Sequence, residues 1–385
     1  MCDGRSRKQR TTSRGDTVRP LSPIRFSLPA CRPQAALLAL TLGAAPGAAW
    51  AQSAVQLWGG VDLGVRHVGN DAGSQTRMQS GNNYTSRLAV TGSEDLGGGL
   101  KASFWLEGTV NATGGAFGTG ASIWDRRSTL SLSGPFGELR LGRDYTPLFR
   151  AFAATDVFGY VGAAGMGTLY NATASTPVAR AFGSGATTVA RANGAVQYYT
   201  PRSLGGFYLN AMLAHASGGP EAADFHFRGV RAGYAAGPLD VSAHAGSTRI
   251  EATGKHFKVY GLAGVYTGGQ AKLTLGAVRM DYLNARQTNY TLGVDWRVGA
   301  GQVRAAYHYV DQSGFAADGS STRGNDAHVL GLGYVHNLSK RTALYGTAAF
   351  VHNQGKARFA VPGGLAGAAA GTGSRGFEVG VRHMF

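Results

Sequence analysis

The sequence predicts an all-β fold, a transmembrane antiparallel β-barrel of sixteen strands. Stretches of about ten residues alternate between apolar and polar or small residues, as strands with two different faces do. No segment keeps a helical period, and no apolar run approaches the ~18 residues that a membrane-spanning helix needs. Glycine supplies 60 of the 385 residues, but there are only 12 prolines and no G-X-Y period, which excludes collagen.

The C-terminal stretch shows this alternation most clearly. One face carries Phe377, Val379, Val381, His383 and Phe385. The other face carries Glu378, Gly380, Arg382 and Met384. Because successive side chains of a strand point to opposite sides, the pattern predicts one apolar and one polar face.

Alternation alone also fits a soluble β-sandwich, and three further features favour a membrane barrel. The strands reach the ~9–11 residues that a tilted spanning strand needs. Aromatic residues such as Tyr198, Tyr199 and Phe385 gather near strand ends, as in an interfacial girdle. Short connections such as SGPFG alternate with long ones at 68–83, 111–123, 146–192, 312–325 and 355–373. Single-chain bacterial barrels have short periplasmic turns and longer external loops.

This pattern predicts where each strand begins. The sixteen expected starts are Ala54, Tyr84, Gly99, Trp124, Gly137, Asn193, Gly205, Phe225, Pro238, His256, Gln270, Gln287, Gly301, Asp326, Arg341 and Ser374. An even number returns the chain to the side where it started. A barrel of this width keeps an aqueous channel instead of a filled interior.

The N-terminal segment 1–51 is expected to be removed before the barrel forms. A basic stretch precedes the apolar run AALLALTLGAAPGAAWA, which ends in the small-residue motif Ala49-Trp50-Ala51. These are the features of a secretory signal peptide behind an N-terminal extension. The barrel domain is therefore expected to span 52–385.

Removal of this segment changes the charge and the cysteine content. It holds eight of the 37 Lys/Arg and two of the 21 Asp/Glu, so the remainder has 29 basic and 19 acidic residues and a net charge of +10. Cys2 and Cys31 also lie in it. The exported chain therefore has no disulfide, thiolate or Cys-based zinc site.

Four motifs resemble the Gram-negative general porin family, in particular its β-proteobacterial members. They are VQLWGGVDLGV, SRLAVTGSEDLGGGLKASFWLEG (Ser86–Gly108), STLSLSGPFGELRLGRDYTPLF (Ser128–Phe149) and the C-terminal GFEVGVRHMF. The resemblance implies an outer-membrane homotrimer with a water-filled channel for small ions and hydrophilic solutes. It also implies that the third external loop, 146–192, folds into the barrel lumen and narrows it. Outer-membrane lipid, lipopolysaccharide and the barrel-insertion machinery, which reads the end at Phe385, are the other expected partners; no nucleic acid is expected.

The resemblance also suggests which residues line the constriction. Family porins place arginines on the wall at positions that match Arg87 and Arg143, and an acid on the loop that matches Asp156. Strand parity adds Arg127, and Arg191 precedes the sixth strand. No Asp or Glu occurs from Val157 through Pro220, so we expect anion preference. The alternative is that the arginines are structural and pair with the lumen-facing acids Asp62, Glu107 and Glu378.

Other functions are less well supported by the sequence. The ten histidines are scattered, and neither H-E-x-x-H nor G-x-S-x-G occurs, so we expect no enzyme, cofactor or metal site. A substrate-selective porin is the main competing interpretation, because Trp58, Trp105 and Tyr208 have lumen parity and could stack on a solute.

Overall fold

The computed structural model describes residues 54–120, 122–170, 176–183, 187–215 and 225–385. The predicted extension and signal peptide, 1–51, lie outside these residues. Within the described ranges, no helix is both long and apolar enough to cross a membrane.

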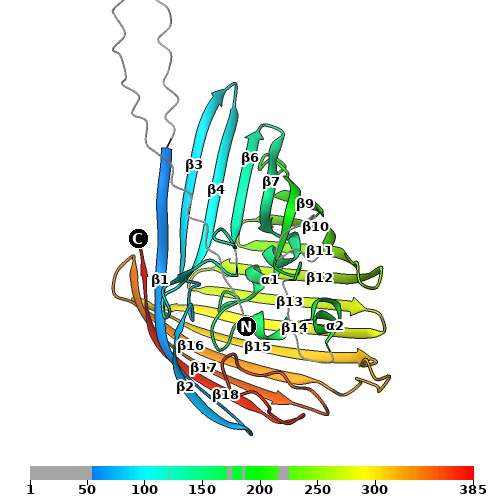
Figure 1. The fold of residues 1–385 in the computed structure, drawn as a ribbon. Helices are drawn as coiled ribbons and strands as arrows, with labels where there is room; N and C mark the ends of the chain where they lie inside the picture. Colours follow the sequence, from blue (N-terminus) through cyan, green and yellow to red (C-terminus); the bar gives the residue numbers. More distant parts are fainter. Residues whose placement is uncertain (1–53, 121, 171–175, 184–186, 216–224) are drawn as a thin grey trace, which may run out of the picture. The chain divides into compact units, whose positions relative to one another are not determined.

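Nearly all of the described chain is β-strand (Figure 1). The strands are β1 (Ala54–Asn70), β2 (Gly73–Ser80), β3 (Arg87–Gly97), β4 (Leu100–Asn111), β5 (Ala116–Phe117), β6 (Arg127–Gly134), β7 (Gly137–Tyr145), β8 (Arg191–Tyr199), β9 (Phe207–His215), β10 (Phe225–Ala236), β11 (Leu239–Ile250), β12 (Lys255–Gly268), β13 (Ala271–Tyr282), β14 (Ala285–Val298), β15 (Gly301–Gly314), β16 (Ala327–Asn337), β17 (Thr342–Asn353) and β18 (Ser374–Met384). Three short helices, α1 (Pro147–Thr155), η1 (Met166–Leu169) and α2 (Pro177–Phe182), lie between β7 and β8.

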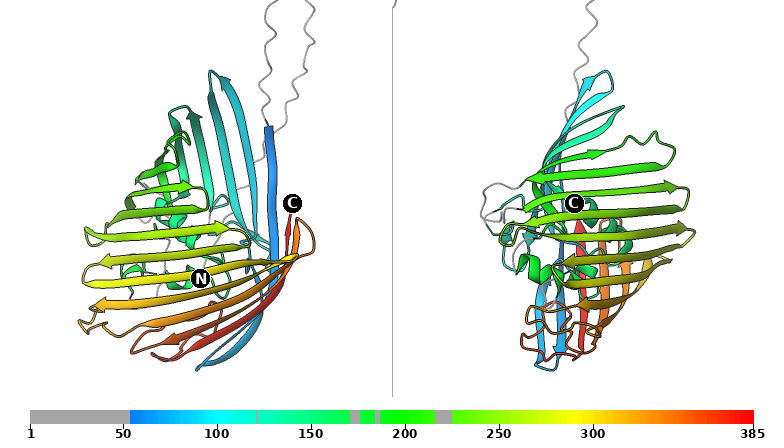
Figure 2. Two further views of the ribbon diagram at one scale, coloured as in Figure 1. Left: turned by 180° about the vertical axis from the view of Figure 1, so that it is seen from behind. Right: turned by 90° about the vertical axis from the view of Figure 1, so that its right-hand side faces the viewer.

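The sheet closes on itself through β1. Its second half pairs with β18, from Gly60↔Met384 to Gly69↔Arg375. Its other edge pairs first with β3 and then with β2. Because β2 and β3 share the position beside β1 and β5 has only two residues, the eighteen strands fill sixteen positions of one closed antiparallel barrel. The predicted fold class and strand number are therefore confirmed, and Figure 2 shows β10 to β17 side by side across one wall.

The predicted strand starts agree closely with the structure. Strands β1, β7, β10, β15 and β18 begin at the predicted residue. The largest difference is three residues, where β3 begins at Arg87 instead of Tyr84 and β6 at Arg127 instead of Trp124. Strand β2 lies in a segment that was predicted to be a loop. Its sequence, GSQTRMQS, lacks apolar alternation, so the periodicity could not reveal it.

The two faces of the barrel are inverted relative to a soluble protein. Apolar side chains such as Leu213 (66% exposed) and Leu275 (64%) face outward, whereas acids such as Asp62 (0%) and Glu107 (2%) are buried inside. An exposed band of large apolar side chains marks a surface that meets something other than water. The predicted lumen parity of Asp62, Glu107 and Glu378 agrees with this arrangement.

The segment between β7 and β8 packs against inward-facing side chains of the barrel. Thr146 caps α1 by accepting a hydrogen bond from Phe149 N (3.3 Å), and Pro147 occupies the first turn. The buried face of α1 contacts β10 to β13. Thr274 Oγ1 donates to the Thr155 carbonyl (2.7 Å), and Gln287 Nε2 donates to the Leu169 carbonyl (2.9 Å).

Two inward-facing glycines leave room for this segment. A Cβ on Gly246 would lie 2.9 Å from Leu148 Cδ1. A Cβ on Gly331 would lie 2.6 Å from the Ala164 Cβ and 2.9 Å from Phe158 Cε2. The wall and the segment therefore fit each other at these points without space for a side chain.

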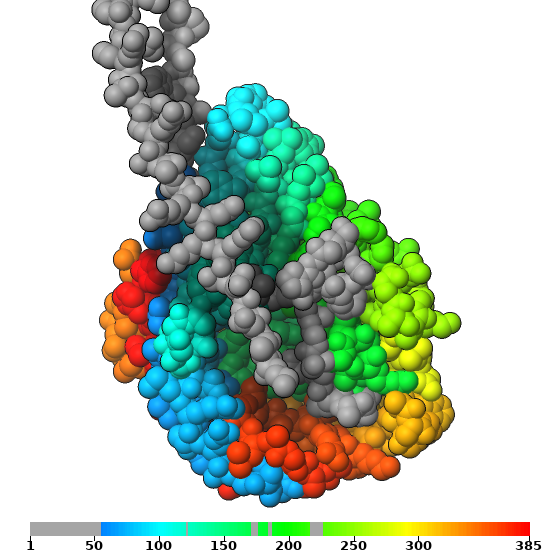
Figure 3. Space-filling view, in the orientation of Figure 1, coloured from blue at the N-terminus to red at the C-terminus, as the bar shows by residue number. Residues whose placement is uncertain are grey.

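A second external segment covers the turn between β1 and β2. Asn70 Nδ2 donates to the Leu365 carbonyl (2.8 Å), and Ala369 N donates to Asp71 Oδ2 (2.9 Å). Figure 3 shows blue and orange-red parts of the surface side by side in this region. The contact ties the long connection after β17 to the rim.

We predict that Gly331→Val displaces the 147–170 segment, because the new side chain would occupy the space of Phe158 and Ala164. Overpacking of this kind lowers the free energy of unfolding by about 1–3 kcal/mol. Thermal unfolding in detergent would measure it. Gly346→Val is the control, because a Cβ there meets Val379 Cγ1 at an ordinary 3.7 Å. Equal stability of the two variants would contradict the proposed fit.

Candidate functional site

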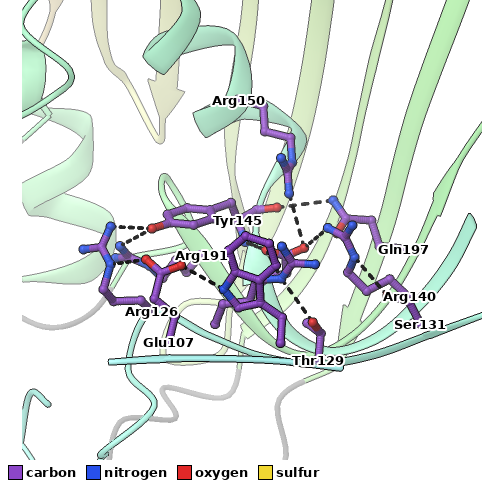
Figure 4. Close-up of polar contacts among 12 residues, drawn as sticks. Glu107, Arg126, Thr129, Ser131, Arg140, Tyr145, Arg150, Arg191 and Gln197 are labelled. Carbon is purple, nitrogen blue, oxygen red and sulfur yellow. Dashed lines mark hydrogen bonds and ion pairs between the residues drawn. The ribbon is translucent and has the colours of Figure 1, made fainter. Parts of the chain in front are cut away.

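Six arginines and three carboxylates form a polar cluster on the inner wall, here called the arginine cluster. Figure 4 shows part of it, with Glu107, Arg126, Arg140, Arg150 and Arg191 labelled. The arginines are Arg87, Arg126, Arg127, Arg140, Arg150 and Arg191, and the carboxylates are Glu107, Glu138 and Asp144. Five of the six arginines come from the wall that runs from β3 to β8, and the sixth comes from α1. The cluster therefore joins the wall to the 147–170 segment.

One half of the cluster is centred on Glu107. Its Oε1 accepts from Arg126 Nε (2.6 Å) and from Arg87 Nη1 (3.0 Å). Its Oε2 accepts from Trp105 Nε1 (3.0 Å). The carboxylate is buried and fully hydrogen-bonded, so a single negative charge is shared between two guanidinium groups.

The other half is centred on Asp144, which lies near three arginines. Arg140 Nη1 donates to its Oδ2, Arg150 Nη2 lies 3.3 Å from Oδ2, and Arg127 Nε lies 3.6 Å from Oδ1. Arg140 also pairs with Glu138 (2.7 Å). Arginines therefore again outnumber carboxylates around Asp144.

The ring of Tyr145 links the two halves. Its hydroxyl accepts from Arg126 Nη2 (2.5 Å) and Arg191 Nη2 (3.2 Å). The Arg191 guanidinium lies over the ring, 4.6 Å from its centroid. Such a cation–π contact holds a guanidinium in place without neutralising its charge.

The six arginines and three carboxylates of the cluster, together with the buried Asp125 carboxylate beside Arg126, leave an excess of two positive charges. Exposure differs among the arginines. The Arg150 side chain is 30% exposed and that of Arg87 20%, whereas Arg126 is 9% exposed. Arg150 and Arg87 therefore present most of the excess charge to the aqueous lumen.

The structure brings Arg87, Arg127 and Arg191 together as expected, but not Arg143. The strand register pairs Arg143 with Ser128, on the side of the sheet that carries Leu130 and Leu141. Arg143 donates to the Asp125 carbonyl (2.7 Å) and to Asn193 Oδ1. The β7–β8 register shifts between Gly142 and Asp144, so strand alternation does not carry through Arg143, and its role in the constriction stays a prediction.

Asp156 also differs from the expectation, because its carboxylate faces its own loop. It is 3% exposed and accepts from the backbone amides of Phe158 (2.8 Å), Tyr160 (2.8 Å) and Met166 (2.7 Å). A carboxylate held by three N–H groups organises the loop. Its role as the acid of the constriction stays a prediction.

Asp62 and Glu378 lie at another part of the wall. Asp62 accepts from the backbone of Asn83 and Tyr84 and from the Tyr345 hydroxyl. Glu378 pairs with Arg66 (2.7 Å) and accepts from Ala163 N (3.2 Å). Both acids hold loop backbone against the barrel instead of neutralising the arginine cluster.

Sequence reasoning missed Arg126, Arg140 and Arg150. The lumen-facing side of Arg140 could have been predicted from the sequence, because Arg140 lies between the outward residues Leu139 and Leu141. Arg126 precedes β6 and has no strand parity. Arg150 depends on α1, where Leu148, Ala151, Phe152 and Thr155 are buried and leave Arg150 on the lumen-facing side. The loop thus contributes a cation where the family pattern suggested an acid.

We predict that Asp156→Asn destabilises the loop but leaves ion selectivity almost unchanged. The amide has one acceptor oxygen for three backbone donors, and an unsatisfied buried donor costs about 1–3 kcal/mol. Planar-bilayer recordings should show noisier open channels at the wild-type zero-current potential. Asp318→Asn, which removes an acid from an exposed turn, is the matched control. A large shift toward anions in Asp156→Asn alone would show that Asp156 does face the lumen.

Comparisons with known proteins agree with this structure. Residues 35–356 match the family model described as Gram-negative porin. The chain is 36% identical to outer membrane porin protein 32 of Delftia acidovorans, over 91% of this chain and 99% of that protein. It is 26% identical to an outer membrane porin of Bordetella pertussis, over 82% and 94%. The solved anion-selective porin from Comamonas acidovorans has a TM-score of 0.73 and 36% identity, and the match covers 87% of this chain and all of that one. The resemblance is thus confirmed, and the chain belongs to the Gram-negative porin family, the β-barrel channels of the outer membrane.

Proposed function

We propose that this outer-membrane channel passes small hydrophilic solutes by diffusion and prefers anions over cations. The observation that carries the proposal is the excess of two positive charges in and beside the arginine cluster. Charges in a narrow aqueous channel with a low-dielectric wall focus the field and concentrate counter-ions. Arginine or lysine rings favour anions in this way.

The inserted segment reinforces the sign of the field. Its acid, Asp156, is bound by backbone amides, whereas its Arg150 lies at the lumen surface. The similar porin from Comamonas acidovorans is described as anion-selective, which supports the same preference here. The narrowing of the lumen by 146–192 is part of this proposal.

Packing of the lumen aromatics favours a general porin over a substrate-selective one. Trp105 meets Trp58 edge to face (5.3 Å between centroids) and lies under the Arg127 guanidinium (4.3 Å). Tyr208 donates to Asp240 (2.6 Å). These rings are engaged with protein neighbours and do not form a free stacking track for a sugar.

The proposal includes the assembly and surroundings of the barrel. We expect a homotrimer in contact with outer-membrane lipid and lipopolysaccharide. We assign no catalytic activity and no cofactor. Insertion by the barrel-assembly machinery would use the strand that ends at Phe385.

Replacing Arg87 and Arg150 together with Ser should move the zero-current potential toward the cation side, because these are the more exposed cations of the cluster. Guanidinium stays charged at any working pH, so wild-type preference should persist from about pH 5 to 9. It should weaken in molar salt, where the Debye length falls to ~3 Å. Arg375→Ser, which removes an exposed arginine from the outer face of β18, is the matched control and should shift the potential less. An equal shift from the control would contradict the assignment of the cluster.

Deletion of Phe385 should lower the amount of folded barrel. The Phe385 and Gly59 backbones exchange two hydrogen bonds (3.1 and 3.2 Å), and the Phe385 ring lies beside Gly59. The deletion removes the last pairing between the two ends of the chain. Heat-modifiable protein in outer membranes measures the effect, and Phe385→Tyr, which keeps the ring, should behave as wild type. Normal yield from the deletion would reject a role in assembly.

A further inference from the structure

A row of charged side chains crosses the outer face of the barrel from β10 to β14. The strand register pairs Arg228 with Ser247, Ser247 with Lys258, Lys258 with Asp281 and Asp281 with Arg286. Directly paired residues of antiparallel strands lie on the same face of a sheet. These five side chains therefore lie next to one another in one line.

This line lies on the membrane-facing side and toward the external rim. Neighbours of the same parity are exposed apolar residues, such as Leu213 (66% exposed) and Tyr260 (45%). The short turns at 237–238 and 269–270 are at the opposite ends of these strands. Short turns face the periplasm in single-chain barrels, so the charged line is in the outer leaflet half.

An apolar groove begins at this line and continues along β11. Its floor is made by small side chains, Ser247 and then Ala245 and Ala243. Arg228 and Val230 form one side, and Lys258 and Tyr260 form the other. The upper part holds about 700 Å³ and the lower part about 890 Å³. One end of the groove is cationic and the rest is apolar.

The two cations at the mouth of the groove form no salt bridge in the described ranges, although Asp281 lies opposite Lys258 in the strand register. Arg279 and Arg286 share Asp281 (both 2.9 Å), whereas Arg228 and Lys258 pair with no carboxylate among the described residues. The positive line also ends at β14. At the rim of β15 to β17, the outward positions Tyr309, His328 and His352 stack as rings instead.

Charge and shape together define an occupant. A cation at the edge of a hydrocarbon surface needs a partner, since an unpaired charge there is costly. Phosphate meets this need and binds both guanidinium and ammonium groups. Arg228 and Lys258 flank Ser247 on strands two positions apart, so their backbones are roughly 10 Å from each other. Both side chains are long enough to reach one phosphate between them.

We propose that this groove binds a phosphorylated lipid of the outer leaflet. One acyl chain lies over Ala245 and Ala243, and its headgroup phosphate lies between Arg228 and Lys258 and accepts from the Ser247 hydroxyl. The inference rests on the proposed contact with lipopolysaccharide and names its site. A second protein chain fits less well, because the cores of protein interfaces are depleted of charged residues.

The test uses the full-length purified barrel in detergent, after removal of native lipid. Binding of fluorescently labelled lipid A with two phosphates is measured alongside a dephosphorylated form and inorganic phosphate. We expect the wild type to bind bisphosphorylated lipid A at least tenfold more tightly than the other two probes. Arg228→Glu with Lys258→Glu should weaken lipid A binding at least tenfold. Ala245→Phe, which fills the groove and keeps the charges, should also weaken it.

Controls separate this inference from the channel proposal. Arg375→Glu reverses an exposed charge on the outer face of β18, away from the groove, and should bind as wild type. Conductance and zero-current potential should be unchanged in all three variants, because none alters the lumen. Unchanged lipid A binding in Ala245→Phe and in the double variant would overturn the inference, as would equal binding of the dephosphorylated lipid. Tight binding of inorganic phosphate alone would show an anion site without a lipid groove.

Discussion

The architecture depends on one constraint, that a chain in hydrocarbon must satisfy every backbone N–H and C=O internally. The chain meets this constraint by pairing β1 with both β18 and the β2–β3 position, so that no strand edge is left open to lipid. Closure fixes which residues face inward, because every strand alternates. The outward apolar band and the buried inner carboxylates are two consequences of the same ladder of hydrogen bonds.

Closure with sixteen strands leaves a wide lumen, and the segment after β7 packs on inward-facing residues of its wall. This segment packs on β10 to β14 through an apolar face, at wall positions where glycine leaves space. Its other side presents Arg150 toward Asp144 and the β3–β8 wall. The lumen therefore has one packed side and one charged side, and the charged side determines which ions are concentrated there. Buried carboxylates keep the arginines in place but are too few to neutralise them.

Much of the fold could be predicted from the sequence because its signals are local. Alternation and short turns placed the starts of the sixteen predicted strands within three residues, and parity gave the lumen positions of Arg127 and Glu107. Asp156 could not be placed, because the amides that bind it meet only after the loop has folded. Arg150 depends on the direction in which α1 docks. Alternation could not decide the side of Arg143, because the β7–β8 register shifts between Gly142 and Asp144.

The sign of the channel's field is the central claim, and the zero-current potential of the wild-type protein tests it most directly. One purified preparation in a planar bilayer, under a tenfold gradient of dilute KCl, would suffice. An excess of arginine over carboxylate at the lumen surface predicts a zero-current potential with the sign of a chloride-selective channel. A zero-current potential with the sign of a potassium-selective channel would contradict the electrostatic account. The barrel fold and the family assignment would not be affected.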